Sequence, residues 1–377
     1  MNEPALSRPS WAEVDLSALA HNLGLARGMA GRAGAGRPGL LAVVKADAYG
    51  HGAVEVSRAL ARRGVRHFGV ATLEEGLALR RAGLEAAILL LGPLDPAWMG
   101  EALRHRVGLS VWDESSLDLA DRAARRGRGR LAVHLKVDTG MSRLGFSPAG
   151  AEAVLARWAA GRWPHLDLAS GYTHFACADE PRDRATPGQL EKFLGLPWPR
   201  GALLHAANSA GWTRYPGARL GLARVGILLY GALEESLHPL ARRQRPVMAL
   251  KTRVVALREI PRGQGVSYGH RFVARRPTRV ATLALGYADG VPRALSGRGQ
   301  VLVRGRRLPI LGRVCMDLLM VDASALSRPR LGEEAVLLGR QAGGRITAGE
   351  WAELCGTNTY EVLCGISGRV PRRTLGG

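Results

Sequence analysis

The sequence predicts a parallel (β/α)8 barrel followed by a second, mainly β domain. Between Leu40 and about Tyr230, short apolar runs alternate with amphipathic helical stretches about eight times, which is the pattern of a parallel barrel. After about Arg242 the helical pattern almost vanishes, and apolar runs are separated by Gly, Pro and Arg turns. Such a texture is typical of an antiparallel β domain. At 377 residues the chain is also too long for one ordinary core.

The barrel elements follow from the periodicity of the apolar residues. Strands are expected at residues 40–44, 67–71, 87–91, 109–112, 131–137, 166–173, 203–206 and about 225–229. Helices are expected between them, at residues 54–62, 73–81, 115–125, 149–159 and 189–194. Thr72 and Asp113 are expected to cap two of these helices through their side-chain oxygens. Gly64, Gly83 and Gly127 are the expected stop signals.

The second domain has strand-like runs separated by turn residues. They lie at residues 247–257, 278–285, 300–303, 308–314, 319–321 and 335–338, with one late helix at 348–354. The early segment Trp11-Ala12-Glu13-Val14 also has the pattern of a strand and is expected to join this domain. The expected organisation is therefore an N-terminal strand within residues 1–14, a barrel over 15–242 and a β domain over 243–377.

Charge and composition exclude several classes of protein. The net charge is +21, but the arginines are scattered over many helices, and the few aromatic residues do not alternate with them as a nucleic-acid platform requires. No apolar stretch approaches the length of a membrane span, and the N-terminus lacks the apolar segment of a secretory signal. The four cysteines show no metal-ligand spacing. We therefore expect a cytoplasmic protein with free thiols and no metal, nucleic-acid or membrane partner.

Lys45 is the first candidate for catalysis. It is one of only four lysines among 53 basic residues, and it directly follows an apolar run in LLAVVKADAYGHG. Burial or a nearby cation can free a lysine amine, which then forms a Schiff base with a carbonyl. The active site of a barrel lies at the C-terminal ends of its strands, so Lys45, His174, Ser209 and Gly226 would share one mouth. The alternative is a surface lysine at a strand end.

The segment VVKADAYGHG resembles the pyridoxal-phosphate attachment motif of bacterial alanine racemases. Similar segments continue in the same order from Val43 to Arg372: HLKVDTGMSRLGF, GYTHFACADE, HAANSAG, ARVGILLYG, GVSYGHRF, LALGYADGVPR, GRVCMDLLMVD and TNTYEVLCGISGRVPR. Any one of them is a weak signal, whereas the whole series is very specific. The resemblance implies pyridoxal 5′-phosphate as the cofactor, and a homodimer whose active sites combine the barrel of one subunit with the β domain of the other.

The resemblance also assigns the acid–base groups. Racemisation removes a proton from one face of a carbon and returns it on the other, which two groups on opposite sides do most simply. These would be Lys45 and Tyr268 of the partner subunit. His174 and Arg224 match the network that tunes this tyrosine. Arg224 also matches the contact to the pyridine nitrogen, where an arginine leaves that nitrogen unprotonated and the ring a weaker electron sink. The alternatives are a turn tyrosine and a surface arginine.

The remaining site positions are likewise implied by the resemblance. The cofactor phosphate would be bound by Tyr49, Ser209, Gly226, Ile227 and Tyr360. Arg143 and the backbone of Met316 would bind the substrate carboxylate. Lys136 matches a lysine that is often carbamylated and braces Arg143, and its alternative is a lysine that merely packs. Supporting positions are Cys315 and Asp317 in the site and Tyr287 at its entrance. Leu318 stands where the family commonly has a polar residue, so no rim hydrogen bond is expected there.

The leading prediction is thus a racemase that interconverts L- and D-alanine and supplies D-alanine for peptidoglycan. Three alternatives stay open: a broad-specificity amino-acid racemase, a decarboxylase on the same two-domain plan, and a barrel that binds pyridoxal phosphate without catalysis. Tyr268 together with Arg143 favours racemisation, because these residues suit proton return and carboxylate retention. The β domain argues against a non-catalytic barrel, which would not need it.

Overall fold

The computed structural model describes residues 8–30 and 38–376. The chain divides into two compact units. The barrel unit comprises Ala20–Ala48 and Gly52–Gln244, and the β unit comprises Met1–Leu19, Tyr49–His51 and Arg245–Gly377. Their architectures confirm the predicted fold class, a (β/α)8 barrel with a second, mainly β domain.

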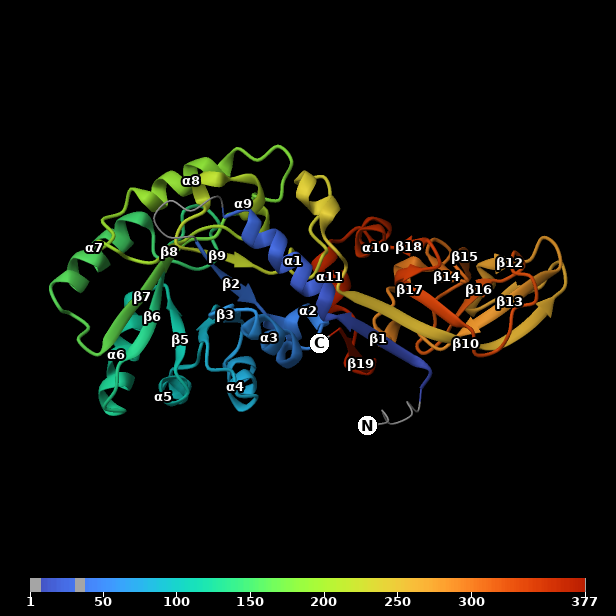
Figure 1. The fold of residues 1–377 in the computed structure, drawn as a ribbon, viewed down its shortest axis with the longest axis horizontal. Helices are drawn as coiled ribbons and strands as arrows, with labels where there is room; N and C mark the ends of the chain where they lie inside the picture. The colour runs from blue at the N-terminus through green and yellow to red at the C-terminus, as the bar shows by residue number, and fades with distance from the viewer. Residues whose placement is uncertain (1–7, 31–37, 377) are drawn as a thin grey trace. The chain divides into compact units, whose positions relative to one another are not determined.

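Eight parallel strands make the barrel unit (Figure 1), hydrogen-bonded in the order β8-β7-β6-β5-β4-β3-β2-β9. They are β2 (Gly39–Val43), β3 (His67–Val70), β4 (Ala87–Leu90), β5 (Val107–Val111), β6 (Leu131–Lys136), β7 (Leu166–Tyr172), β8 (Leu204–His205) and β9 (Leu222–Val225). The backbone N–H of Arg224, on β9, donates to the Ala207 carbonyl just after β8 at 3.0 Å. This bond links the two outer strands of the order. The expected eighth strand at 225–229 was placed too late, because the chain turns after Val225 and Leu229 N–H bonds back to Gly226 O.

Helices surround these strands on the outside (Figure 1). They are α1 (Leu16–Gly28), α2 (Lys45–Gly50), α3 (Ala53–Arg62), α4 (Leu73–Arg81), α5 (Met99–Arg104), α6 (Glu114–Arg126), α7 (Pro148–Ala159), α8 (Ala185–Leu194) and α9 (Ser209–Arg214). Thr72 and Asp113 form the capping boxes of α4 and α6, which confirms both predicted caps. The sequence analysis did not predict α1, α2, α5 or α9. The last three have six residues each, too few to establish a helical period, and the apolar residues of α1 show little helical periodicity.

A nine-stranded sheet dominates the β unit, in the order β18-β17-β14-β15-β16-β13-β10-β1-β19. Its strands are β1 (Ser10–Asp15), β10 (Met248–Ile260), β13 (Thr278–Leu283), β14 (Gln300–Val303), β15 (Arg306–Leu311), β16 (Leu319–Asp322), β17 (Glu334–Gln341), β18 (Gly344–Ile346) and β19 (Arg372–Leu375). A separate pair consists of β11 (Gly265–Val266) and β12 (Phe272–Val273), and two helices follow late in the chain, α10 (Ala348–Cys355) and α11 (Thr359–Cys364). β1 lies between β10, to which it is antiparallel, and β19, to which it is parallel.

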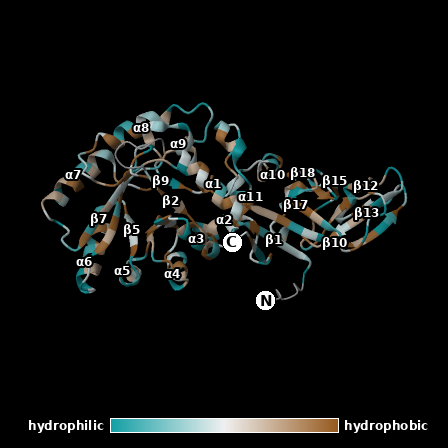
Figure 2. Cartoon of the chain, in the orientation of Figure 1, coloured by the Kyte–Doolittle hydropathy of each residue, from teal (hydrophilic) through white to brown (hydrophobic). Residues whose placement is uncertain are grey.

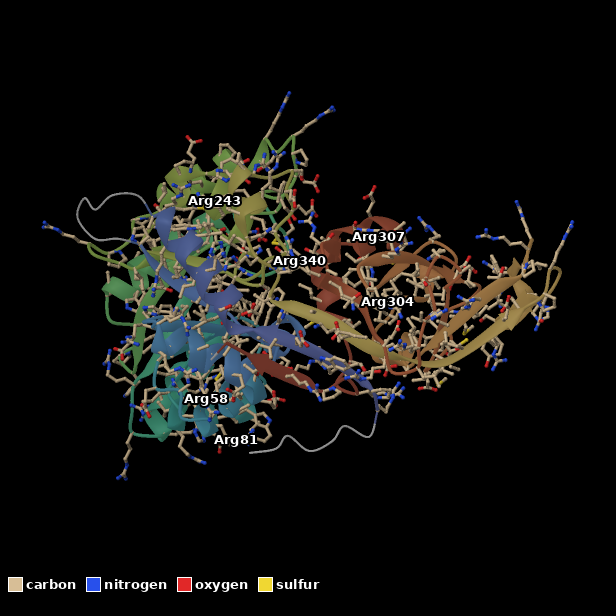
Figure 3. The ribbon with its side chains drawn as sticks, turned by 45° about the vertical axis from the view of Figure 1, so that its right-hand side comes forward. Arg58, Arg81, Arg243, Arg304, Arg307 and Arg340 are labelled. Atoms are coloured by element: carbon tan, nitrogen blue, oxygen red, sulfur yellow. The ribbon has the colours of Figure 1, made fainter. Side chains whose placement is uncertain are left out.

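Polar residues concentrate on the outer helices, and apolar residues concentrate on the strands. In the barrel unit, teal hydrophilic segments lie on the outer helices and the strands are paler to brown (Figure 2). The arginine surplus lies on the surface: the six arginines labelled in Figure 3 (Arg58, Arg81, Arg243, Arg304, Arg307 and Arg340) are all exposed. None of the helices in residues 8–30 and 38–376 combines the length and apolar character that crossing a bilayer requires.

Candidate active site

Lys45 stands at the C-terminal end of β2 and begins a left-handed turn. The four residues that follow it in α2 all have positive φ, between 51° and 55°, although none is glycine. This conformation costs roughly 1–2 kcal/mol per residue. Two carboxylates hold it: Glu75 Oε1 accepts from Ala46 N–H at 2.7 Å, and Asp47 Oδ1 accepts from Ala53 N–H at 2.7 Å. The exposed lysine therefore rests on strained but well-anchored backbone, as is common at functional sites.

Several cations gather around this mouth. Lys136 ends β6 and is 5% exposed. Burial, followed by the charges of Arg143 and Arg224, lowers the pKa of Lys136 to about 8. Burial likewise holds the pKa of His174 well below its ordinary value, with further contributions from Arg224, Arg143, Lys136 and Lys45. Because such effects require proximity, these five residues share one end of the barrel. The concentration of positive charge suits an anionic ligand.

Arg224 is the most heavily bonded of these groups. Its Nη1 donates to His205 Nδ1 at 2.9 Å and to His205 O at 3.1 Å. Its Nη2 donates to Thr173 O at 2.7 Å, to Ala206 O at 2.9 Å and to His174 Nδ1 at 3.2 Å. Within the described chain these bonds engage both Nη groups and leave the Nε–H without an acceptor. Arg224 is 4% exposed, so the alternative of a surface arginine is wrong.

Two residues that sequence reasoning did not assign, Tyr172 and His205, support Arg224. Their rings stack with centroids 4.9 Å apart at an interplanar angle of 2°, and Arg224 Cζ lies 5.2 Å from the Tyr172 centroid. The Ser110 hydroxyl donates to Leu90 O at 2.7 Å, so it accepts from the Tyr172 hydroxyl, which lies 2.7 Å away. Both residues fall inside the motifs quoted above, but their type and spacing alone do not distinguish them from core side chains.

Ser209, Gly226 and Ile227 lie together where the loops after the last two barrel strands meet. Ser209 Oγ accepts from Gly226 N–H at 3.0 Å and from Leu228 N–H at 3.4 Å. Asn208 caps α9 through its side chain, which accepts from Gly211 N–H at 2.8 Å. In (β/α)8 barrels a phosphate site frequently forms at the loops after the seventh and eighth strands, and β8 and β9 hold those places here.

In the β unit, Tyr268 lines a cavity of about 540 Å³ together with the segment Cys315–Leu318, referred to below as the cysteine loop. Tyr268 is 69% exposed. It lies in a tight turn, between Ser267 (φ 65°) and Gly269 (φ 69°). The structure thus brings together four residues of the β unit that the sequence singled out: Tyr268, Cys315, Met316 and Asp317. Leu318 lines the same cavity and is 41% exposed.

The backbone of the cysteine loop is fixed by a neighbouring turn. Tyr287 N–H donates to Cys315 O at 2.9 Å, and Ala288 N–H donates to Met316 O at 3.0 Å. A Cβ on Gly286 would lie 2.2 Å from Met316 O, so this close approach requires glycine. In the described chain the Met316 carbonyl is occupied while its N–H donates to no residue. The side chain of Tyr287 lines a separate cavity with Arg293 and Glu361.

Asp289, which sequence reasoning missed, anchors that turn. It is fully buried and accepts from both Nη groups of Arg8, at 2.7 and 3.0 Å, and from Gly286 N–H at 3.0 Å. Arg369 Nε lies 3.7 Å from Asp289 Oδ1, and Arg369 Nη2 donates to Asp317 Oδ1 at 2.7 Å. A buried carboxylate between two arginines therefore connects the turn to the cysteine loop.

Tyr49 and Tyr360, the two tyrosines expected at the phosphate, lie together in the β unit. Their ring centroids are 5.8 Å apart at 44°. Burial is the main cause that raises the pKa of Tyr49 far above its ordinary value, so its hydroxyl stays protonated and able to donate a hydrogen bond. Tyr360 is carried by α11, a six-residue helix that the periodicity did not reveal.

Comparison with known proteins gives concordant matches over almost the whole chain. The family model "Alanine racemase, N-terminal domain" matches residues 14–234, and "Alanine racemase, C-terminal domain" matches residues 247–374. The alanine racemase of Symbiobacterium thermophilum is 42% identical over 372 residues, covering 97% of each chain. That of Sorangium cellulosum is 44% identical over 383 residues, covering 97% of this chain and 98% of the relative.

Solved structures agree with these matches. The alanine racemase from D-cycloserine-producing Streptomyces lavendulae has a TM-score of 0.89 and 37% identity, covering 100% of this chain and 98% of that one. The alanine racemase from Bacillus anthracis, solved with bound L-Ala-P, has a TM-score of 0.89 and 34% identity, covering 99% and 97%. The resemblance stated from the sequence motifs is thereby confirmed.

Proposed function

The chain belongs to the alanine racemase family and is an alanine racemase, and we propose that it interconverts L- and D-alanine by two-base proton transfer on pyridoxal 5′-phosphate. Lys45 serves one face of the substrate Cα, and Tyr268 of the partner subunit serves the other. The observation that carries this proposal is the barrel mouth, where Lys45 shares one electrostatic environment with Lys136, Arg143, His174 and Arg224.

Three features of the barrel mouth fit the cofactor. Lys45 offers an exposed amine for its aldehyde. The Nε–H of Arg224, which bonds to none of the described residues, suits its ring nitrogen, and the junction of Ser209 with Gly226 suits its phosphate. Ile227, Tyr49 and Tyr360 are the further phosphate positions we propose. When bound, pyridoxal phosphate withdraws electrons from the substrate Cα and makes its proton removable.

Arg224 sets how strongly those electrons are withdrawn. A guanidinium donates hydrogen bonds and holds its protons, so a cofactor ring nitrogen bound by Arg224 would remain an acceptor without a proton of its own. Burial lowers the pKa of Arg224 to about 10, which still leaves it charged at neutral pH. A restrained electron sink favours prompt return of the proton over side reactions.

Arg143 and the Met316 N–H are the groups we propose for the substrate carboxylate. The Asp138 carboxylate accepts from the backbone of the loop that carries Arg143, and the turn at Gly286 presents the Met316 amide. We further propose that Lys136 is carbamylated. A buried amine whose pKa is lowered to about 8 beside Arg143 is reactive towards carbon dioxide, and the resulting anion would pair with the arginine instead of repelling it.

A homodimer with shared sites is part of the same proposal. Tyr268 and Met316 are 69% and 53% exposed on the β unit, where a second copy would give both a partner surface. Cys315 and Asp317 line the same cavity, and we propose that Tyr287, which borders a neighbouring cavity, lines the entrance to the shared site. We place the reaction in the cytoplasm, with D-alanine passing to peptidoglycan synthesis.

Deuterium exchange across a panel of amino acids tests this function. In D2O the enzyme should replace the Cα hydrogen of L- and D-alanine and abolish optical rotation without releasing carbon dioxide. Lys45→Ala should remove both exchange and the borohydride-trappable attachment of the cofactor, whereas Lys192→Ala, at an exposed lysine of α8, should change neither. Carbon dioxide release would indicate a decarboxylase, and equal exchange of bulky amino acids would indicate a broad-specificity racemase.

A further inference from the structure

A chain of hydrogen bonds runs from Arg224 into the barrel interior, away from the groups assigned above. Arg224 Nη1 lies 2.9 Å from His205 Nδ1, His205 Nε2 lies 2.8 Å from Ser170 Oγ, and Ser170 Oγ lies 2.6 Å from His134 Nδ1. Ser170 and His205 are 1% and 0% exposed. Four neighbouring strands contribute to the series, since His134 belongs to β6, Ser170 to β7, His205 to β8 and Arg224 to β9.

The local backbone is arranged to make this series possible. The pairing of β6 with β7 shifts by one residue between Val133 and His134, which leaves Ala169 as a bulge and sets Ser170 opposite His134. A Cβ on Gly108 would lie 2.7 Å from His134 Nε2, and a Cβ on Gly171 would lie 2.2 Å from the Trp198 ring. The two glycines therefore make room for the imidazole on one side and for the bulged strand on the other.

The direction of every proton in the series follows from Arg224. A guanidinium has donors and no acceptor, so His205 Nδ1 must accept and His205 carries its proton on Nε2. That proton is donated to Ser170 Oγ, and the Ser170 hydroxyl in turn donates to His134 Nδ1. Burial keeps both imidazoles neutral, lowering the pKa of His205 well below its ordinary value and that of His134 to about 3. Each hydrogen bond of the series therefore has a single direction, from donor to acceptor.

We propose that Ser170 and His134 are positioning residues for Arg224, acting through His205. The relay, defined as Arg224, His205, Ser170 and His134, holds the His205 ring in the tautomer and orientation that accept from Nη1. If the His205 ring turned or carried its proton on Nδ1, it would repel Nη1 and rotate the guanidinium, moving the Nε–H that we propose for the cofactor ring nitrogen. This role rests on the proposed function of Arg224, whereas the arrangement of protons in the relay does not.

Imidazole nitrogen NMR on the cofactor-free protein tests the arrangement directly. We expect His205 and His134 to be neutral and protonated on Nε2 between pH 6 and 9, with a protected His205 N–H. Ser170→Ala should expose that N–H to rapid exchange and shift its resonance. A wild-type His205 protonated on Nδ1, or a resonance unchanged in Ser170→Ala, would overturn the proposal without bearing on whether the enzyme racemises alanine.

Kinetics on the cofactor-loaded enzyme test the consequence. Ser170→Ala and His134→Leu should each lower kcat about five- to tenfold, as expected for one broken hydrogen bond, with little change in KM and a shifted absorbance of the bound cofactor. The double variant should be no worse than either single one, because the relay is broken once. His134→Asn keeps an acceptor at the Nδ1 position and should restore most of the kcat. Additive losses, or a His134→Asn enzyme as poor as His134→Leu, would show a packing role only.

Discussion

Glu75 fastens the backbone after Lys45 to the helix that begins beside it. Its Oε1 accepts from Ala46 N–H at 2.7 Å, and its Oε2 accepts from Ala71 N–H at 2.7 Å and from Thr72 N–H at 3.3 Å. One carboxylate therefore completes the capping box of α4 and restrains the first residue of the left-handed turn. The orientation of the lysine depends on a side chain thirty positions later in the sequence.

Removing that carboxylate should loosen both structures. We expect Glu75→Ala to lower the free energy of unfolding by about 1–3 kcal/mol, because it leaves three backbone amides without this acceptor, and to lower kcat more than it raises KM. Urea denaturation and steady-state kinetics measure the two effects. Glu75→Gln keeps one acceptor oxygen and should fall between Glu75→Ala and the wild type. If the wild type, Glu75→Ala and Glu75→Gln had equal kcat, the restraint of the turn by Glu75 would have no role in catalysis.

Relieving the strain after Lys45 should stabilise the protein at the expense of activity. Ala46→Gly removes the Cβ that disfavours positive φ, so the free energy of unfolding should rise by about 1 kcal/mol while a more mobile Lys45 lowers kcat. Ala61→Gly, in the right-handed helix α3, is the matched control and should destabilise by about 1 kcal/mol. If Ala46→Gly destabilises as much as the control, the turn is not strained.

Lys136 gives a pH dependence with a definite sign. Its folded-state pKa is lowered from 10.5 to about 8, so below pH 8 the folded protein holds an unfavourable buried charge that is relieved as pH rises from about 8 towards 10.5. Without bicarbonate, Lys136→Met should therefore be more stable than the wild type at pH 7 by roughly 1–3 kcal/mol, and the difference should shrink above pH 8.

Bicarbonate should reverse that ranking. Carbamylation replaces the cation by an anion beside Arg143, so the wild type gains stability and Lys136→Met does not. Unfolding midpoints with and without bicarbonate, together with the mass of the intact chain under mild conditions, check this outcome. A wild-type midpoint that bicarbonate leaves unchanged would argue against the modification.

The buried carboxylate of Asp289 should matter for both folding and substrate binding. Asp289→Ala leaves Arg8 and the Gly286 amide without their acceptor, and we expect a loss of about 3–5 kcal/mol in the free energy of unfolding together with a higher KM for alanine. Asp317→Asn breaks only the exposed pair with Arg369 and should cost at most about 1 kcal/mol. If both variants lost similar amounts of unfolding free energy and had similar KM values, Asp289 would not be needed to hold the cysteine loop in place.

Tyr268 is the most direct test of the two-base scheme. Tyr268→Phe removes only a hydroxyl from a 69% exposed ring, so the fold and the cofactor absorbance should persist. Deuterium exchange should fall by about a hundred- to ten-thousandfold, most severely from L-alanine. An unimpaired Tyr268→Phe enzyme would remove this residue from the mechanism.

The sequence correctly predicted the features that depend on residues close together in the chain. The apolar period located the barrel strands within a few residues, and Thr72 and Asp113 were identifiable as caps because capping depends on residues three apart. It predicted poorly what only three-dimensional packing decides. Nothing in Ala46-Asp47-Ala48-Tyr49 demands positive φ, and β9 was misplaced because the apolar run continues past Val225 into the turn at Gly226.

The site followed the same division. Motifs indicated the residues that we propose to face the ligand, whereas the residues that support them were not predicted. Asp289, Tyr172 and the relay acquire their roles only from burial and from partners on other strands. The bulge at Ala169 is equally invisible in the one-dimensional pattern, since a short strand of a parallel barrel shows no strict alternation in which one extra residue could be recognised.

The place of β1 in its sheet has a consequence for biosynthesis. Ala12 pairs with Leu250 on one side and with Arg372 on the other, so during synthesis β1 waits for both neighbours until β10 and then β19 have been translated. The barrel strands meet most of their partners soon after synthesis. β1 must therefore remain without these partners until β10 is made, and β19, which is made later still, completes the pairing of β1.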